Sequence, residues 1–375
     1  MQTLRTHVKK SPTYLLYTLI SIAVVIFIIP FRFLKRLFTR NTAAQNFEAL
    51  EIEANKGPIT SFIFKQWTGD TTTAQQNRIF VYFLMPALGG FLLMVIVPFI
   101  MGVYFSLTNW TGLNTGRQLF IGLENYLVLA GDFKFFYSFM RTALYSGLNI
   151  IAINVVAFSL ALIVTQNLKL KNVYRAGFFL PNLIGGLVLG YIWQFIFNEA
   201  VVEIGSGFER SLLIDSDTAM IALITVVTWQ YAGYIMMIYI AALQNVPMEL
   251  IEASKIEGAN ALQRLRHVVL PLVAQAFTIS LFLTLVTSFK QFDTVQSLTQ
   301  GFPSARLPEW IMNLYNVTVT QTVFSLDLVA SDIYKEAFTR YNMGMGQAKA
   351  IIFFLVLGMI SLVQVYFNKR REIEL

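Results

Sequence analysis

The side chains that could do chemistry in this sequence are mostly neutral, and they lie in long apolar segments. The 375 residues include no cysteine and two histidines, His7 and His267. Thiolate chemistry is therefore excluded, and two distant histidines make no histidine metal site. The polar residues of the apolar segments are amides and hydroxyls: Asn149, Asn154, Asn182, Gln194, Gln230, Gln275, Thr284 and Thr287. Ion-coupled carriers usually keep acids, lysines or histidines within the bilayer, so this pattern argues against a proton- or sodium-driven carrier.

The sequence also excludes ATP binding through a Walker A loop, a common way in which a transport protein obtains energy from ATP. The sequence has no Gly-Lys dipeptide, so it holds no Walker A phosphate-binding loop. We therefore expect a non-catalytic subunit with no cofactor, in which any ATP hydrolysis belongs to a partner chain.

The composition places these residues in a membrane protein. Charged residues make up 13% of the chain and hydrophobic residues 56%, with a mean hydropathy of +0.60. Soluble domains carry about 25% charged residues, so a water-soluble enzyme is excluded. About 20 apolar residues cross the bilayer as a helix. Charge-free runs thus predict an all-α fold with seven spans, over residues 11–31, 79–116, 142–168, 176–198, 218–248, 268–289 and 350–368.

Basic residues predict the orientation of these spans. Residues 32–78, 169–175, 245–267 and 369–371 are rich in Lys and Arg and fall on one side when the spans alternate. This side is predicted to be cytoplasmic, with the carboxy terminus there and the amino terminus outside. The net charge of +7 is explained by this topology, so we expect no nucleic-acid partner.

The amino-terminal 78 residues precede a six-helix body. Residues 1–31 are predicted to form an extra transmembrane helix, although a cleaved signal peptide is an alternative. The stretch is long for a signal, and Ile28-Ile29-Pro30-Phe31-Arg32 offers no small-residue cleavage site. Residues 32–78 are predicted to be a cytoplasmic connector.

The segment 247–271 between the fifth and sixth predicted spans is the most informative one. Pro247 suits a helix start, and Glu249 and Glu252 oppose the positive pole of the helix dipole. Gly258 is placed to end the helix in a left-handed conformation. A second amphipathic piece over residues 260–268 leads into the next span. A short helix held between two spans can transmit a push from a soluble partner.

This segment resembles the EAA loop of binding-protein-dependent ABC importer permeases. Their pattern is Glu-Ala-Ala, three residues, Gly, nine residues, Ile, one residue, Leu-Pro. The sequence has Glu252-Ala253-Ser254, Gly258, Val268 and Leu270-Pro271 at that spacing, with Ser254 and Val268 as the departures. The likeness extends over residues 79–371 and is closest to the carbohydrate subgroup, whose larger maltose-type permeases also have an extra leading span. Its motifs here include residues 106–110, 120–126, 174–181, 288–292 and 298–303.

The resemblance implies a six-helix type I permease core in a bacterial or archaeal cytoplasmic membrane. It implies a second homologous permease, two ATP-binding cassette subunits, an extracytoplasmic solute-binding protein and a carbohydrate substrate as partners in the lipid bilayer. The coupling residues implied are Glu252, Ala253, Ser254, Gly258, Leu270 and Pro271. The substrate-binding residues implied are Asn182, Gly186, Gln230, Tyr231, Tyr234, Thr284 and Ser288.

Alternatives stay open for these assignments. The pocket residues are types that also pack transmembrane helices together. Trp110 and Trp310 are typical of interface anchors, and residues 310–324 could contact the binding protein, contact a long substrate or form a surface hairpin. The solute could instead be a glycerol phosphodiester or a polyamine. An independent channel or carrier with a chance EAA match is a further alternative.

Overall fold

The computed structural model describes residues 84–112, 118–166, 168–203, 210–317 and 322–369. The chain divides into two compact units, Met1–Gly102 and Val103–Leu375. The described part of the first unit is helical from Leu84 and includes η1 (Leu92–Ile96) and the start of α6 (Val97–Ser106). The predicted leading span over residues 1–31 and the connector over 32–78 lie outside the described residues.

The described residues confirm an all-α membrane protein with a small β-hairpin added. Four helices are long and apolar enough to cross a membrane: Leu84–Ser106, α8 (Phe133–Val164), α12 (Ser216–Gln244) and α20 (Met343–Lys369). Two further helix pairs meet the same test but are sharply bent, so up to six spans are present if each pair counts as one. The predicted spans 176–198 and 268–289 are therefore not straight helices.

The first bent pair breaks next to a proline. α9 (Lys171–Phe179) continues into a 3-10 turn, η2 (Leu180–Leu183), and α10 (Gly186–Phe195) then leaves at 97° before η3 (Ile196–Ala200) and α11 (Val201–Glu203). Pro181 has no backbone N–H to donate, and Ile184 adopts an extended conformation with ψ 127°. The α-helical hydrogen-bond ladder therefore stops at this turn.

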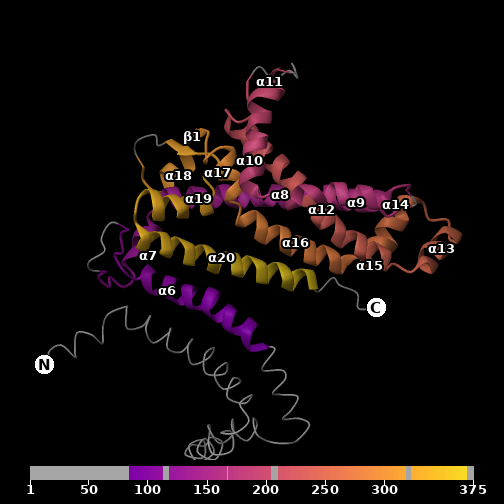
Figure 1. Ribbon diagram of the computed structural model, residues 1–375, viewed down its shortest axis with the longest axis horizontal. Helices are drawn as coiled ribbons and strands as arrows, with labels where there is room; N and C mark the ends of the chain where they lie inside the picture. Colours follow the sequence, from indigo (N-terminus) through magenta and orange to yellow (C-terminus); the bar gives the residue numbers. More distant parts are fainter. Residues whose placement is uncertain (1–83, 113–117, 167, 204–209, 318–321, 370–375) are drawn as a thin grey trace, which may run out of the picture. The chain divides into compact units, whose positions relative to one another are not determined.

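The second bent pair includes the segment predicted as the coupling loop. α13 (Met248–Ile256) is followed by α14 (Ala261–Arg264), η4 (Leu265–Val269) and α15 (Leu270–Leu272). The chain bends by 73° at Val273, and α16 (Ala274–Phe289) then crosses the bundle. Figure 1 shows α13 and α14 at one end of the second unit, beyond the ends of α12 and α16.

The core of the second unit lies where α8, α12 and α16 run side by side (Figure 1). Its largest fully buried side chains include Tyr145, Ile153, Leu223, Met236 and Tyr239. Neutral polar groups also join these helices. Asn154 Nδ2 donates to Thr284 Oγ1 at 3.0 Å, and Tyr239 Oη donates to Asn154 Oδ1 at 2.7 Å. The predicted spans thus pack through a mixture of apolar contacts and interhelical hydrogen bonds.

The opposite end of the second unit is a compact cap. It contains α7 (Glu124–Ala130), α18 (Glu309–Leu314), α19 (Val329–Tyr334) and η5 (Lys335–Thr339). Between this cap and the helix break, α17 (Asp293–Leu298) lies along α10. Strands β1 (Ser304–Arg306) and β2 (Thr322–Phe324) pair antiparallel, with Ala305 opposite Val323. Within the 310–324 region only β2 belongs to a hairpin, because its partner β1 precedes residue 310 and residues 310–314 are part of α18. Trp310 is half exposed and meets the Phe136 ring edge-on.

A buried ion cluster fixes the beginning of α20 in this cap. Lys349 is fully buried, and its Nζ lies 2.8 Å from Asp332, 3.0 Å from Asp132 and 3.0 Å from Glu336. The predicted span 350–368 therefore starts too late, because α20 begins at Met343. The charge of Lys349 ends the apolar run in the sequence, but three carboxylates neutralise it in the fold.

Candidate functional site

The end of α13 has the geometry predicted for Gly258. Its φ is +82°, a left-handed conformation that glycine adopts without strain. The N–H of Ala259 donates to the Ser254 carbonyl and the N–H of Gly258 to the Lys255 carbonyl, both at 3.0 Å. These two bonds form a Schellman motif, which satisfies carbonyls that the last helical turn leaves free. The helix therefore stops at a defined place and the chain reverses.

Hydrogen bonds also fix the conformation of the residues that follow Gly258. Asn260 caps α14 through a reciprocal capping box with Gln263, at 2.9 and 2.8 Å. Arg264 Nη1 donates to the Ala259 carbonyl at 2.7 Å. The two short helices and the turn between them thus form one braced unit, which we call the knob (residues 248–264). Its stiffness would allow it to transfer a displacement to α16.

The predicted coupling residues do not all share one surface. Glu252, Ala253 and Gly258 are exposed on the knob. Ser254 is buried, and its hydroxyl donates to the Ile251 carbonyl at 2.7 Å. Leu270 and Pro271 are half-buried in α15, at the base of the knob. The first group can touch a partner, whereas the second group supports the knob.

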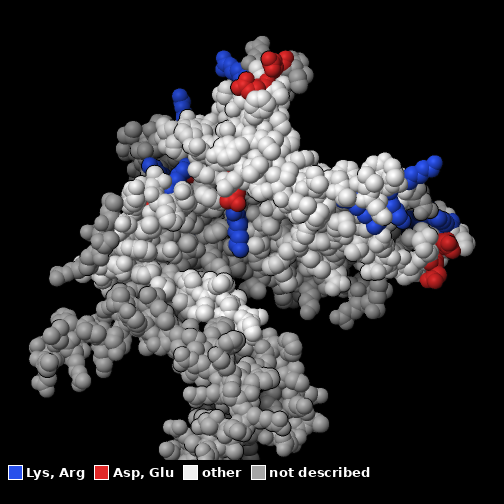
Figure 2. Space-filling model, in the orientation of Figure 1, with Lys and Arg blue, Asp and Glu red and all other residues white. Residues whose placement is uncertain are grey.

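The exposed surface of the knob combines apolar and charged side chains. Ile256 is 88% exposed and Leu262 is 72% exposed. Glu252 and Glu257 add acidic groups, and Figure 2 shows acidic and basic atoms next to one another at this end of the second unit. Large apolar side chains this exposed, within a well-ordered charged turn, favour a protein-binding surface.

A second group of predicted residues surrounds the helix break at Ile184. Gln230 on α12 is buried, and its Nε2 donates to the Ile184 carbonyl at 3.1 Å, which occupies a carbonyl released by the break. Gly186 begins α10, and a Cβ there would lie 3.0 Å from the Cβ of Asp293 on α17. Tyr231 and Asn182 are half-buried beside the same break. The fold therefore brings four of the seven predicted substrate residues to one place.

Thr284 and Ser288 lie in a different environment. Thr284 is 1% exposed and bonded to Asn154, while Ser288 is 0% exposed and accepts a bond from Asn149 Nδ2 at 2.8 Å. Both bonds join α16 to α8. Within this chain Thr284 and Ser288 pack two helices together, which is the alternative to substrate binding that the sequence leaves open.

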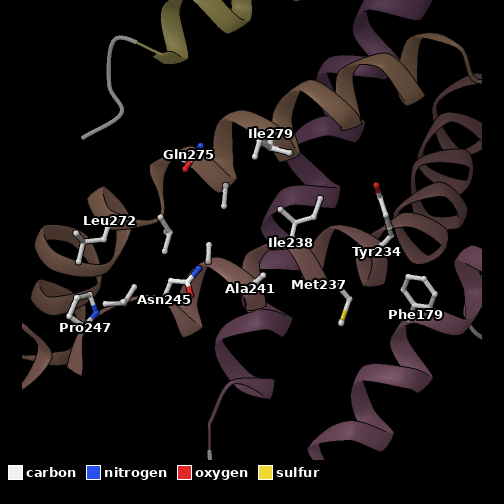
Figure 3. Close-up of a pocket in the computed structure, with 14 residues that line it drawn as sticks. Phe179, Tyr234, Met237, Ile238, Ala241, Asn245, Pro247, Leu272, Gln275 and Ile279 are labelled. Carbon is white, nitrogen blue, oxygen red and sulfur yellow. The ribbon is translucent and has the colours of Figure 1, made fainter. Parts of the chain in front are cut away.

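Tyr234 lines a cavity of about 680 Å³ on the side of α12 toward the knob. Figure 3 shows the cavity between the second half of α12 and the beginning of α16, with Asn245 and Gln275 among the labelled side chains. Most of the wall is apolar. Its far end is formed by Pro247, directly before the knob, and by Leu272 of α15, between the knob and the bend at Val273. One cavity thus extends from a predicted substrate residue to both connections of the knob.

The structure also reveals charged residues that the sequence interpretation assigned to loops. Lys290 caps the end of α16 and Asp293 opens α17, and both are exposed. Asp293 acts electrostatically on the Tyr231 phenol. In the sequence, both residues simply follow the last apolar run. The position of Asp293 next to the helix break depends on α17 lying along α10, which no local pattern indicates.

Comparisons with known proteins agree with this geometry. The family model described as a binding-protein-dependent transport system inner membrane component matches residues 153–373. A probable starch degradation products transport system permease from Thermoanaerobacterium thermosulfurigenes is 43% identical over 78% of this chain and 94% of its own length. A multiple sugar-binding transport system permease from Streptococcus mutans is 29% identical over 74% of this chain and 90% of its own length.

The fold has a solved counterpart as well. A bacterial ABC transporter involved in the import of the acidic polysaccharide alginate matches with a TM-score of 0.64 and 18% identity. The match covers 79% of this chain and 96% of that chain. This likeness supports the arrangement of helices described above.

Proposed function

The chain belongs to the family of binding-protein-dependent transport system inner membrane components, and from this premise we propose that it is one of two permease subunits of an ATP-driven importer of neutral oligosaccharides. The observation that carries the proposal is the knob of residues 248–264. It has the spacing of the EAA loop, a helix ended by Gly258 and an exposed surface of apolar and acidic side chains.

The knob is proposed to lie in the cytoplasm and to seat in a groove of one ATP-binding cassette subunit. Glu252 and Glu257 would pair with basic groups of that groove, and Ile256 and Leu262 would bury apolar area there. Complete burial of such a side chain contributes about 1.5 to 3 kcal/mol. Because the knob is braced and joined to α16 by a bend at Val273, movement of the ATPase pair would rotate α16 and α12 together.

The solute path is proposed to run past the helix break and then along the cavity beside Tyr234. Neutral amides and aromatic rings are suited to sugars, whose faces are apolar and whose rims carry hydroxyls. Gln230 and Tyr231 would contact the solute at the break, and Tyr234 would offer its ring at the mouth of the cavity. Thr284 and Ser288 would hold α16 against α8 beside this path.

Starch-derived oligosaccharides are the proposed solutes because the relative that is 43% identical is named for starch degradation products. The complete importer would contain a second permease, two ATPase subunits and an extracytoplasmic solute-binding protein. The two ATPase subunits would supply the energy, since no Walker A loop is present in this chain.

The test is sugar uptake by proteoliposomes that contain the complete importer. Uptake of maltotriose should require ATP, the binding protein and both permeases. Gly258→Asp should abolish uptake and the stimulation of ATP hydrolysis by the binding protein, because its carboxylate adds a negative charge to the surface proposed to meet the ATPase subunit. The permeases should still insert and pair, because a Cβ at Gly258 would meet none of the non-neighbouring atoms of the described residues within 4 Å.

Gly122→Asp is the matched control. Gly122 also has a positive φ, +64°, and open space around it, but it lies before α7 at the other end of the second unit. This variant should keep most of the uptake. Normal uptake by Gly258→Asp at normal protein level would refute the coupling role, and sugar transport by this chain alone in liposomes would refute the proposed function.

A further inference from the structure

Two buried polar atoms at the helix break have no hydrogen-bond partner within the described residues. They are Oε1 of Gln230, which is 4% exposed, and Oγ1 of Thr294, which is 1% exposed. Buried polar groups in native proteins are nearly always paired. The Gln230 amide is fixed by its bond to the Ile184 carbonyl, so its oxygen is held as a free acceptor. Thr294 Oγ1 lies 3.1 Å from the Cβ position of Gly186, on the other side of the same break.

Asp293 adds a carboxylate next to the helix break. Its Cβ lies 3.0 Å from the Cβ position of Gly186, and its charge acts on the phenol of Tyr231. None of the ion pairs found among the described residues includes Asp293 or its exposed neighbour Lys290. Figure 2 shows a few acidic and basic atoms near the junction of α16 and α17, in the middle of a surface that is otherwise uncharged there.

Asp293 is an exposed carboxylate in the first turn of α17, and α17 lies against α10, which begins at the helix break. Here it accompanies a second fixed acceptor, Gln230 Oε1, and two hydroxyls, those of Thr294 and Tyr231. Acceptors in excess of donors complement a ligand that brings several O–H donors. Adjacent hydroxyls of a neutral sugar ring supply such donors, and a carboxylate can accept both at once. A sugar that carries its own carboxylate would instead be repelled by Asp293.

We propose that Asp293 and Thr294, together with Gln230 and Tyr231, form a hydroxyl-binding subsite at the helix break, and that Asp293 selects neutral sugars against acidic ones. This inference rests on the proposed function, because it assigns a solute-binding place within the same path. Asp293 and Thr294 are new members of that path, since both follow the apolar run of α16 in the sequence and reach the break only through the fold.

A purely structural role for Asp293 has a different signature. Asp293 lies in the first turn of α17, where an acid also stabilises the helix through its dipole. Asp217 is the matched control, because it is likewise an exposed acid in the first turn of a helix, α12, and has no place at the break. A dipole effect should be similar for Asp293→Asn and Asp217→Asn and should not depend on the sugar.

The experiment measures binding of radiolabelled maltotriose to the purified importer without its binding protein, with competition by unlabelled trigalacturonate. Asp293→Asn should weaken maltotriose binding at least about tenfold, the factor for one charged hydrogen bond at the weak end of its range. Trigalacturonate should compete several times better against this variant than against the unaltered importer. Thr294→Val should weaken maltotriose binding by a smaller factor and leave the ratio of the two sugars unchanged.

The outcomes separate the two proposals. Unaltered maltotriose binding and competition in Asp293→Asn, with normal uptake by the unaltered importer, would overturn the subsite alone. An equal loss in Asp293→Asn and Asp217→Asn would also overturn it, in favour of the dipole role. An unaltered importer that neither binds nor imports any neutral oligosaccharide would overturn the proposed function and the subsite together.

Discussion

Replacing Gly258 by larger residues separates the shape of the knob from its fit to a partner. At φ +82° an L-residue costs about 1 to 2 kcal/mol more than glycine. The alanine Cβ would meet none of the non-neighbouring atoms of the described residues within 4 Å, so the cost of Gly258→Ala lies in the backbone. A cost of that size lowers the equilibrium ratio of knobs that have the left-handed turn to knobs that lack it by a factor of about 5 to 30. Asparagine tolerates the left-handed conformation better than alanine does, and Gly258→Asn should therefore cost less.

The assay measures uptake and stimulated ATP hydrolysis by the reconstituted importer. If the conformation of the knob limits coupling, Gly258→Ala should lose several-fold more uptake than Gly258→Asn, although asparagine is the larger residue. Gly122→Ala imposes the same backbone strain away from the knob, at φ +64°, and should leave the coupling ratio of sugar imported per ATP unchanged.

Two results would refute this reasoning. Full coupled transport by Gly258→Ala would show that the left-handed turn is not needed. A loss that increases with side-chain size, with asparagine worse than alanine, would show that the space around Gly258 in a partner's groove matters and that the backbone strain does not.

Further predictions concern packing, charge and pH. Lys349→Met should lower the free energy of unfolding by about 3 to 5 kcal/mol in detergent, because it leaves buried carboxylates unpaired. Lys335→Met, at the partly exposed pair with Asp327, should lower it by about 1 kcal/mol. Equal shifts of the thermal midpoint in the two variants would contradict this prediction. Asn154→Leu should cost about 1 to 2 kcal/mol by the loss of two interhelical bonds, and its effect should not add to that of Thr284→Val in a double-mutant cycle. Burial raises the pKa of the Asp332 carboxyl above its ordinary value of 3.8, against the opposing charge of Lys349 and with the help of Asp327 and Asp132. Between pH 3.8 and the raised pKa, the native state holds a proton that the unfolded state has released. The contribution of Asp332 to stability should therefore decrease as the pH rises through this range. Asp332→Asn should remove this part of the pH dependence of the thermal midpoint.

Local sequence signals predicted the knob well because the forces that shape it are local. A glycine after a helix and a proline at a helix start act within a few residues of themselves. The same locality explains the errors at the ends of the spans. The apolar run that predicts the last span ends at the charge of Lys349, and no local pattern indicates that Asp132, Asp332 and Glu336 neutralise this charge.

By itself the sequence determined that the chain is helical and lies in a membrane, that its spans are almost free of charge, and that one loop has a glycine where a left-handed turn is required. These properties follow from composition and short-range geometry. Only the tertiary structure decided which polar residues meet. It placed Thr284 and Ser288 in bonds between helices, and it gathered Gln230, Tyr231 and Asp293 at a break between Ile184 and Gly186. The physical reason is that a released carbonyl and a buried amide are satisfied by partners from distant segments, and the chain selects those partners only when the helices pack.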